Sequence, residues 1–206
     1  MEKVLKIDRE NPDLSLLRRA ARSIQKGEVI AFPTDTFYGL GADALNPRAV
    51  EKVFEIKQRD RKKPILVLVS NFGQAADLVK DVPSEAWRLM SRFWPGPLTL
   101  VFVASDKVPD LITAGTGKIG IRVPGDPLTT LLLRTLAVPI TATSANRSGA
   151  ASPTTAQEVL ETLGHEVALI LDAGKTPGGM PSTVVDVTTS PITLLREGQI
   201  SAEMLK

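Results

Sequence analysis

The sequence predicts an α/β fold in which flanking helices cover a twisted mixed sheet. Short apolar runs alternate with amphipathic segments along the 206 residues, as in proteins built from packed layers of strands and helices. A helix expected between the apolar runs 29–32 and 65–69 favours a parallel crossover, whereas the close spacing of the last strands favours antiparallel pairing. Because no repeat or long polar linker interrupts residues 1–206, we expect a single domain.

Elements in the first half of the chain follow from apolar patterning and from residues that start helices. Residues 29–32 are expected to form a strand that Pro33 stops. Asn46 followed by Pro47 is typical of a helix start, because asparagine caps the first turn and proline fits within it. The continuous apolar run 65–69 predicts a strand buried on both faces.

Elements in the second half are predicted in the same way. Helices are expected to begin near Ser84, Asp126 and Thr155, and the last of these opens with a possible capping box between Thr155 and Glu158. Strands are expected at residues 98–103, 119–123, 140–143, 167–171, 183–187 and 192–195.

Composition excludes several classes of site. The chain has no cysteine, which excludes disulfides, thiolate metal sites and a cysteine nucleophile. Its one histidine, His165, follows a helix end and is expected on the surface, so neither zinc chemistry nor a histidine-based triad is expected. With no signal peptide and no run of about 18 apolar residues, we expect a cytoplasmic protein without membrane contact. The net charge of +2 does not by itself imply nucleic-acid binding.

The first polar segment that indicates chemistry is residues 33–44. Hydroxyls, a carboxylate and two glycines directly follow a buried strand there. Ligands in α/β sheets usually bind beyond the carboxyl ends of strands, and glycines let the backbone approach them closely. A turn rich in capping residues explains the same composition equally well.

The second segment is the basic cluster 57–64. Lys57 extends the buried stripe of the helix that begins at Pro47, so its side chain should lie against the rim of the sheet. Pro64 enforces an extended exit, which places Arg59 and Lys63 on the connection into a buried strand. Three cations at that rim suit a polyphosphate, and we favour this reading over an ordinary solvated face.

Two further segments carry polar groups in unusual settings. Residues 141–153 combine small hydroxyl side chains with Asn146, and their backbone amides could form an anion-binding nest, although flexible loops have the same composition. Arg122 stands within the apolar run 119–123, where a guanidinium is costly unless it is paired. It therefore either pairs with an internal carboxylate or binds an anionic ligand.

Together these segments resemble the YrdC family, the threonylcarbamoyl-AMP synthases. Seven motifs occur in the family's order over about residues 16–198: PTDTFYGLG (33–41), KxRxxxKP (57–64), WPGPLT (94–99), IGIRVP (119–124), SANxSG (144–149), PSTVVD (181–186) and REG (196–198). The resemblance implies a twisted sheet around a basic cavity. It also implies that L-threonine, bicarbonate and ATP yield threonylcarbamoyl-AMP and pyrophosphate, for N6-threonylcarbamoyladenosine (t6A) at tRNA position 37.

The resemblance assigns roles where the motifs match. The residues expected to hold L-threonine are Thr36, Leu68, Arg122, Ala142 and Ser182. The residues expected to hold ATP are Arg59, Lys63, Lys118, Ser144, Asn146, Ser152 and Arg196. Lys57 and Arg59 are expected to act in catalysis by offsetting charge on the phosphates, a task shared with Mg²⁺ bound to ATP. Leu68 departs from the family pattern, because some members carry a histidine there, near the threonine.

The resemblance also implies a transient contact with the complex that transfers the threonylcarbamoyl group to tRNA. Longer members carry an extra C-terminal domain, and we expect no lid from such a domain here. The main alternative is a non-catalytic binder of structured RNA that uses the same cavity, although RNA binders usually spread cations over an outer face and add stacking aromatics. A third reading is a related carbamoyl-adenylate enzyme that uses carbamoyl phosphate, which normally belongs to a larger chain.

Overall fold

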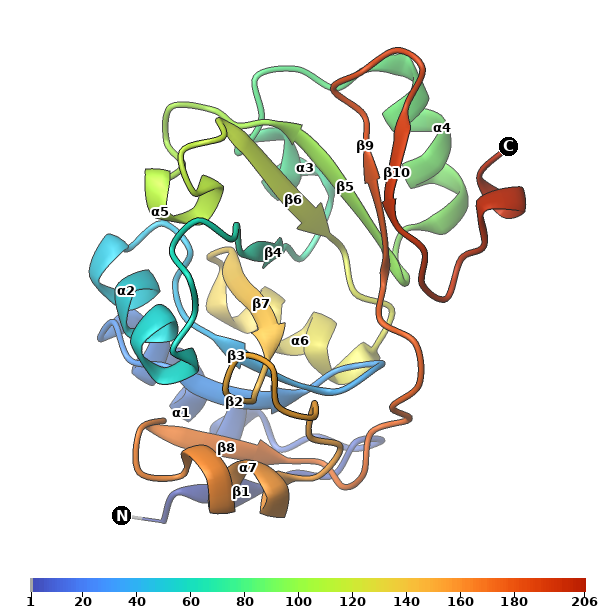
Figure 1. Ribbon diagram of the computed structural model, residues 1–206. Helices are drawn as coiled ribbons and strands as arrows, with labels where there is room; N and C mark the ends of the chain where they lie inside the picture. The colour runs from blue at the N-terminus through green and yellow to red at the C-terminus, as the bar shows by residue number, and fades with distance from the viewer. Residues whose placement is uncertain (1) are drawn as a thin grey trace.

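Ten strands form one sheet that contains both parallel and antiparallel pairs (Figure 1). The computed structural model describes residues 2–206. The strands lie in the order β1-β8-β2-β3-β7-β4-β6-β5-β9-β10. Their bounds are β1 (Val4–Lys6), β2 (Ile30–Pro33), β3 (Tyr38–Gly41), β4 (Leu66–Leu68), β5 (Leu98–Val103), β6 (Lys118–Arg122), β7 (Ile140–Ser144), β8 (Leu169–Asp172), β9 (Thr183–Asp186) and β10 (Thr193–Arg196). The predicted mixed α/β sheet is confirmed.

Four helices begin where the sequence predicts, at or next to Pro47, Ser84, Asp126 and Thr155. The helices are α1 (Leu14–Gln25), α2 (Pro47–Lys57), α3 (Phe72–Ala76), α4 (Ser84–Phe93), α5 (Asp110–Thr113), α6 (Pro127–Leu136) and α7 (Ala156–Leu163), with a 3₁₀ turn η1 (Ala202–Leu205). Asn46 and Asp126 cap α2 and α6 through their side chains, and Thr155 and Glu158 form the predicted capping box of α7. Sequence analysis missed α1, although Asp13 caps it by accepting from the Ser15 amide at 2.7 Å.

Helices cover both faces of the sheet half that contains β1, β8 and β2. Neighbouring residues of a strand point to opposite faces, so Ile30 and Ala31 of β2 belong to different clusters of the core. Ile30 packs with the apolar residues of α1 and α6, whereas Ala31 packs on the side of α7. This half of the sheet is therefore a rigid support for the residues that follow β2.

The predicted parallel crossover between residues 29–32 and 65–69 is wrong. The segment after β2, expected as a ligand loop, turns back as β3 and pairs with β2 antiparallel, and β7 then lies between β3 and β4. Two glycines weakened the strand pattern of β3. Gly41 is needed for packing, because a Cβ there would lie 2.8 Å from the Phe32 ring.

The last strands are divided between the two ends of the sheet. β9 and β10 pair antiparallel as predicted, but β8 lies at the far end between β1 and β2. The segment 173–182 therefore runs along one side of the molecule to join the two ends (Figure 1). Within this segment, the Gly178 amide donates to the Thr36 carbonyl at 2.7 Å.

His165 is exposed, as expected. None of the helices within residues 2–206 is long and apolar enough to cross a membrane.

Candidate functional site

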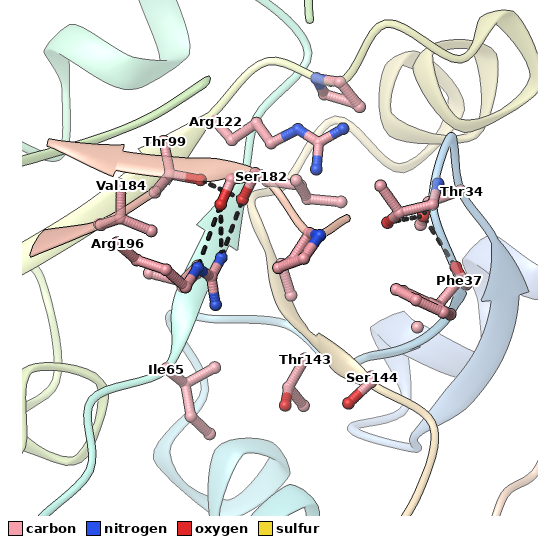
Figure 2. A pocket seen from close by; sticks show the side chains of 18 of the residues that line it. Thr34, Phe37, Ile65, Thr99, Arg122, Thr143, Ser144, Ser182, Val184 and Arg196 are labelled. Atoms are coloured by element: carbon pink, nitrogen blue, oxygen red, sulfur yellow. Dashed lines mark hydrogen bonds between the residues drawn. The ribbon is translucent and has the colours of Figure 1, made fainter. Parts of the chain in front are cut away.

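A cavity of about 800 Å³ lies between two halves of the sheet, one formed by β1, β8, β2, β3 and β7 and the other by β4, β6, β5, β9 and β10 (Figure 2). Strand β6 shows how its wall is built, because alternate residues of a strand face the same side. Lys118 and Arg122 face the cavity, whereas Ile119 and Ile121 between them are buried in the core. The polar residues of the wall include Thr34, Asp35, Thr36, Arg59, Thr99, Lys118, Arg122, Thr143, Ser144, Ser152, Ser182, Asp186 and Arg196.

Most of the residues expected to bind ligands meet on this wall. Those that line the cavity are Thr36, Arg59, Leu68, Lys118, Arg122, Ala142, Ser144, Ser152, Ser182 and Arg196. Lys57, Lys63 and Asn146 do not line it. The structure thus brings ten expected residues together from segments that are far apart in the sequence.

Arg122 is held in a fixed orientation at the cavity wall. Its Nε donates to the Gly96 carbonyl at 2.9 Å, and its Nη2 forms a salt bridge with the Asp35 carboxylate. Its Nη1 makes no hydrogen bond to any of the described residues 2–206. Only 9% of the Arg122 side chain is exposed, and the guanidinium projects between Ser182 and Thr34 (Figure 2). Both expected roles are therefore open to it, since it pairs with an internal carboxylate and still offers Nη1 to a ligand.

Arg196 is the second guanidinium on this side of the cavity. Its Nε and Nη2 donate to the Ser182 carbonyl at 3.1 and 2.8 Å, and the Ser182 hydroxyl lies 3.0 Å from that of Thr99 (Figure 2). Burial, and then the nearby charge of Arg122, lowers the pKa of Arg196. Two cations close enough to influence each other make this side of the cavity favourable for anions.

Arg59 reaches the cavity from the opposite side because of the way α2 ends. Gln58 adopts a left-handed conformation (φ 50°) and turns the chain out of the helix. The Arg59 Nε and Nη2 then donate to the carbonyls of Lys63 and Pro64, at 3.2 and 2.8 Å. Burial lowers the pKa of Arg59, and the charge of Asp60 partly offsets this. Lys63 itself is exposed, so the structure uses its backbone rather than its ammonium group.

Lys57 lies where the helical stripe predicts, but its side chain is directed into the protein rather than to the cavity. It is 2% exposed, and its Nζ donates to the Ser144 carbonyl at 2.5 Å. Nζ also donates to the Asn146 carbonyl at 2.8 Å and to Asn146 Oδ1 at 2.9 Å. Burial, and then the charge of Arg59, lowers the pKa of Lys57 to about 7. Lys57 and Asn146 are therefore placed to position residues 144–146, and their expected contact with the phosphates stays a prediction.

Both carboxylates on the wall are paired with cations. Asp186 accepts from Lys118 Nζ at 2.8 Å, and although burial opposes its ionisation, hydrogen bonds from Lys118 and Thr188 lower its pKa. Asp35 pairs with Arg122.

Sequence analysis gave no role to Asp35, Asp186 or Thr99, although all three stand within quoted motifs, because a motif does not show which way a side chain points. Among residues 2–206 no group of three or more histidine, cysteine or acidic side chains could hold a metal ion.

Comparison with known proteins agrees with this arrangement. The family model Sua5_yciO_yrdC, described as "Telomere recombination", matches residues 22–198. The threonylcarbamoyl-AMP synthase of Pyrococcus abyssi is 43% identical over 190 residues, which are 92% of this chain and 56% of that protein. The enzyme of the same name from Bacillus subtilis is 41% identical over 191 residues, 92% of this chain and 55% of that protein. The chain therefore spans just over half the length of these relatives.

A solved structure shares the fold. Pyrococcus abyssi Sua5 complexed with L-threonine superposes with a TM-score of 0.94 at 40% sequence identity, covering 98% of this chain and 59% of that one. The resemblance drawn from seven motifs is confirmed, since the family model spans all seven. On this match, and on the identity to relatives over most of its length, the chain belongs to the Sua5/YciO/YrdC family.

Proposed function

We propose that the protein is a nucleotidyltransferase that makes threonylcarbamoyl-AMP and pyrophosphate from L-threonine, bicarbonate or CO₂, and ATP. One observation carries the proposal: a single cavity collects Arg59, Lys118, Arg122 and Arg196 together with hydroxyl groups. The names of two relatives and the L-threonine in a solved structure of the same fold support the choice of substrates.

L-Threonine is proposed to bind beside Arg122. A guanidinium whose Nε and Nη2 are already held presents its remaining nitrogen in a fixed direction, which suits a carboxylate. The hydroxyls of Thr36 and Ser182 lie on the same wall and can hydrogen-bond to the amino acid, with the backbone of Ala142 near them. Leu68 replaces a polar contact with an apolar one, which suits the threonine methyl group.

ATP is proposed to fill the rest of the cavity. Arg59 and Arg196 hydrogen-bond only to protein oxygens without a formal charge and form no ion pair within residues 2–206, so they can attract phosphate groups. The hydroxyls of Ser144 and Ser152 and the ammonium of Lys118 provide further donors. Lys57 contributes from behind the wall by fixing the carbonyl and side chain of Asn146.

The reaction needs no protein nucleophile. The threonine ammonium gives up a proton to solvent, and the resulting amine adds to CO₂ and loses a second proton to give a carbamate. The carboxylate oxygen of the carbamate then attacks the α-phosphorus of ATP. The bond between the α-phosphorus and the oxygen that bridges the α- and β-phosphates breaks. Pyrophosphate leaves with the electron pair of that bond. The residues of this chain would align the two substrates and offset the charge that develops on the phosphates. Mg²⁺ would enter with ATP as part of the substrate, since both wall carboxylates already pair with cations.

The proposed product is a mixed anhydride that must be passed on for t6A formation at tRNA position 37. A complex that transfers the threonylcarbamoyl group to tRNA is its proposed recipient, through a transient contact. The cations of this site lie inside a cavity with small hydroxyl neighbours, rather than on an outer face with stacking aromatics. That placement favours a nucleotide substrate over a structured RNA.

Pyrophosphate release tests the proposal directly. Purified protein is given ATP, Mg²⁺, L-threonine and bicarbonate, and threonine or bicarbonate is omitted in turn. We expect release only with both, together with a product that has the mass of threonylcarbamoyl-AMP. ATP consumption without any need for threonine would overturn the choice of amino acid. RNA binding with a steep salt dependence and no ATP consumption would indicate the RNA-binding function instead.

A further inference from the structure

We propose that Asp35 binds the α-ammonium group of the amino-acid substrate, and that the Asp35–Arg122 pair together recognises the zwitterion. This inference rests on the proposed function and extends it to a residue that the motifs left without a role. The pair joins the loop between β2 and β3 to the last residue of β6, so it links the two halves of the sheet.

Hydrogen bonding leaves one side of each partner free. A single nitrogen of Arg122, Nη2, contacts both oxygens of Asp35. A carboxylate has about four lone-pair positions, so each Asp35 oxygen keeps capacity to accept another donor. On the arginine, Nη1 has no hydrogen bond to residues 2–206, while Nε is held by the Gly96 carbonyl. Both residues line the cavity, and 23% of the Asp35 side chain is exposed.

An α-amino acid is the chemical complement of this pair. Its ammonium and carboxylate stand on one carbon, so they need an acceptor and a donor side by side. Asp35 provides the acceptor and Arg122 the donor, and their salt bridge need not break. The carboxylate of the ligand would bind Nη1, and its ammonium would bind Asp35. Charge-assisted hydrogen bonds of this kind are among the stronger ones in proteins.

The other carboxylate of the wall is less suited to this role. Asp186 already accepts from Lys118 Nζ at 2.8 Å, and from the backbone amide and hydroxyl of Thr188 at 2.8 and 2.6 Å. Its partner Lys118 stands at the opposite end of β6 from Arg122, so Asp186 is poorly placed for the ammonium of an amino acid whose carboxylate binds Arg122. Among the described lining residues, Asp35 and Asp186 are the two acidic side chains.

Holding the ammonium matters for the proposed reaction because this nitrogen becomes the carbamate nitrogen. A ligand fixed at both of its charged groups has its nitrogen at a defined place in the cavity. Asp35 would thus select amino acids over hydroxy acids and would direct the reacting nitrogen.

The test compares two ligands that differ by one group. L-Threonine and (R)-3-hydroxybutanoate share the methyl, hydroxyl and carboxylate, but the second lacks the amine. Binding to the full chain is measured by titration calorimetry or by NMR shifts. We expect the unmodified protein to prefer L-threonine by at least about tenfold, the scale of a hydrogen bond between charged groups. In Asp35→Asn, affinity for L-threonine should fall until this preference largely disappears, while affinity for hydroxybutanoate should hold or rise.

Two variants make the result decisive. Asp186→Asn removes the same charge from the same cavity and should keep the preference for the amine. Asp35→Glu retains a carboxylate and should restore part of the preference, which also covers the case of an Asp35→Asn protein that does not fold. If Asp35→Asn weakens both ligands by the same factor, Asp35 only orients Arg122 and the proposal is wrong. If the unmodified protein binds no L-threonine, the proposed function itself fails, which is a separate outcome.

Discussion

Arg59 is the residue whose removal should separate chemistry from folding. Its guanidinium lines the cavity and hydrogen-bonds only to the carbonyls of Lys63 and Pro64, so the fold does not depend on it for a buried ion pair. We expect Arg59→Ala to reduce pyrophosphate release roughly 10²- to 10³-fold, the usual effect of losing a group that stabilises developing charge. Steady-state release with saturating substrates checks this.

Arg61 offers a matched control two residues further on. Its side chain is 67% exposed and pairs with Glu51 outside the cavity. Arg61→Ala should therefore release pyrophosphate at the unmodified rate. A folded Arg59→Ala protein with undiminished release would remove Arg59 from the mechanism.

Lys57 should give the stability of the protein a distinctive pH dependence. Its pKa is about 7 in the folded chain against 10.5 in the unfolded chain. Between these values the unfolded chain binds more protons, so the free energy of unfolding should rise with pH by up to about 1.4 kcal/mol per pH unit. The contribution is complete above about pH 10.5 and is lost as the pH falls through 7.

Urea unfolding of the unmodified protein and of Lys57→Met, at several pH values from 6 to 9, isolates this effect. The difference between their free energies of unfolding should grow with pH, because methionine does not titrate. Lys52→Met, which removes an exposed lysine from the same helix, should leave the pH dependence unchanged. Parallel curves for Lys57→Met and the unmodified protein would mean that Lys57 stays protonated in the folded chain throughout this range.

Residue types and their order predicted where the site lies better than what each residue touches. Motif matching identified ten residues that line the cavity. It also assigned Lys57 to the phosphates, which stays a prediction, but it did not indicate that three oxygen atoms of the protein surround the Lys57 ammonium. Asp35 and Asp186 were left without a role, because their cationic partners Arg122 and Lys118 are distant in the sequence and meet them only in the folded chain.

Among the secondary-structure elements, β9 is anchored to the segment after β10 by one hydroxyl group. Thr183 Oγ1 accepts from the amides of Gly198 and Ile200, both at 3.0 Å, and donates to the Ile200 carbonyl at 2.6 Å. Thr183→Val keeps the shape but leaves three buried backbone groups without partners. We expect a loss of about 3 kcal/mol in the free energy of unfolding, measured in urea.

The exposed Thr193 of β10 provides the comparison for Thr183. Its hydroxyl contacts only that of Thr189, also on the surface. Thr193→Val should change stability by less than about 0.5 kcal/mol. Equal losses in the free energy of unfolding for Thr183→Val and Thr193→Val would show that the buried Thr183 hydroxyl does not anchor the segment after β10.

Helices and strands that are determined by residues close in the sequence could be predicted. Those that depend on contacts with distant segments could not. Asn46, Asp126 and Thr155 each cap a helix through their own side chains, which sequence alone can indicate. Strand β3 was missed because two glycines weaken its pattern, and one of them, Gly41, is required by the Phe32 ring of the neighbouring strand. The position of β8 at the far end of the sheet depends on its pairing with β1 and β2, which no local pattern records.

For the whole molecule, ligands should link the two halves of the sheet. The wall combines Thr36 and Ser144 from one half with Lys118 and Arg196 from the other. A ligand at 100 times its dissociation constant stabilises a protein by about 2.7 kcal/mol, which corresponds to roughly 5–10 °C in unfolding temperature for a chain of this size. We expect that shift with Mg²⁺ and an α,β-methylene analogue of ATP, measured by calorimetry. An unchanged midpoint at millimolar analogue would mean that the folded chain does not bind the nucleotide appreciably, which would contradict the proposed function.

The position of segment 173–182 has a consequence for biosynthesis. The lining residues extend from Phe32 to Arg196, and the two ends of the sheet are joined only after β8 has been made. During most of translation, the cationic residues of the nascent chain are therefore present, but the cavity that brings them together around a nucleotide is incomplete. Substrates cannot template the early stages of folding on the ribosome, and the capacity to bind them should arise abruptly, once β9 and β10 have emerged.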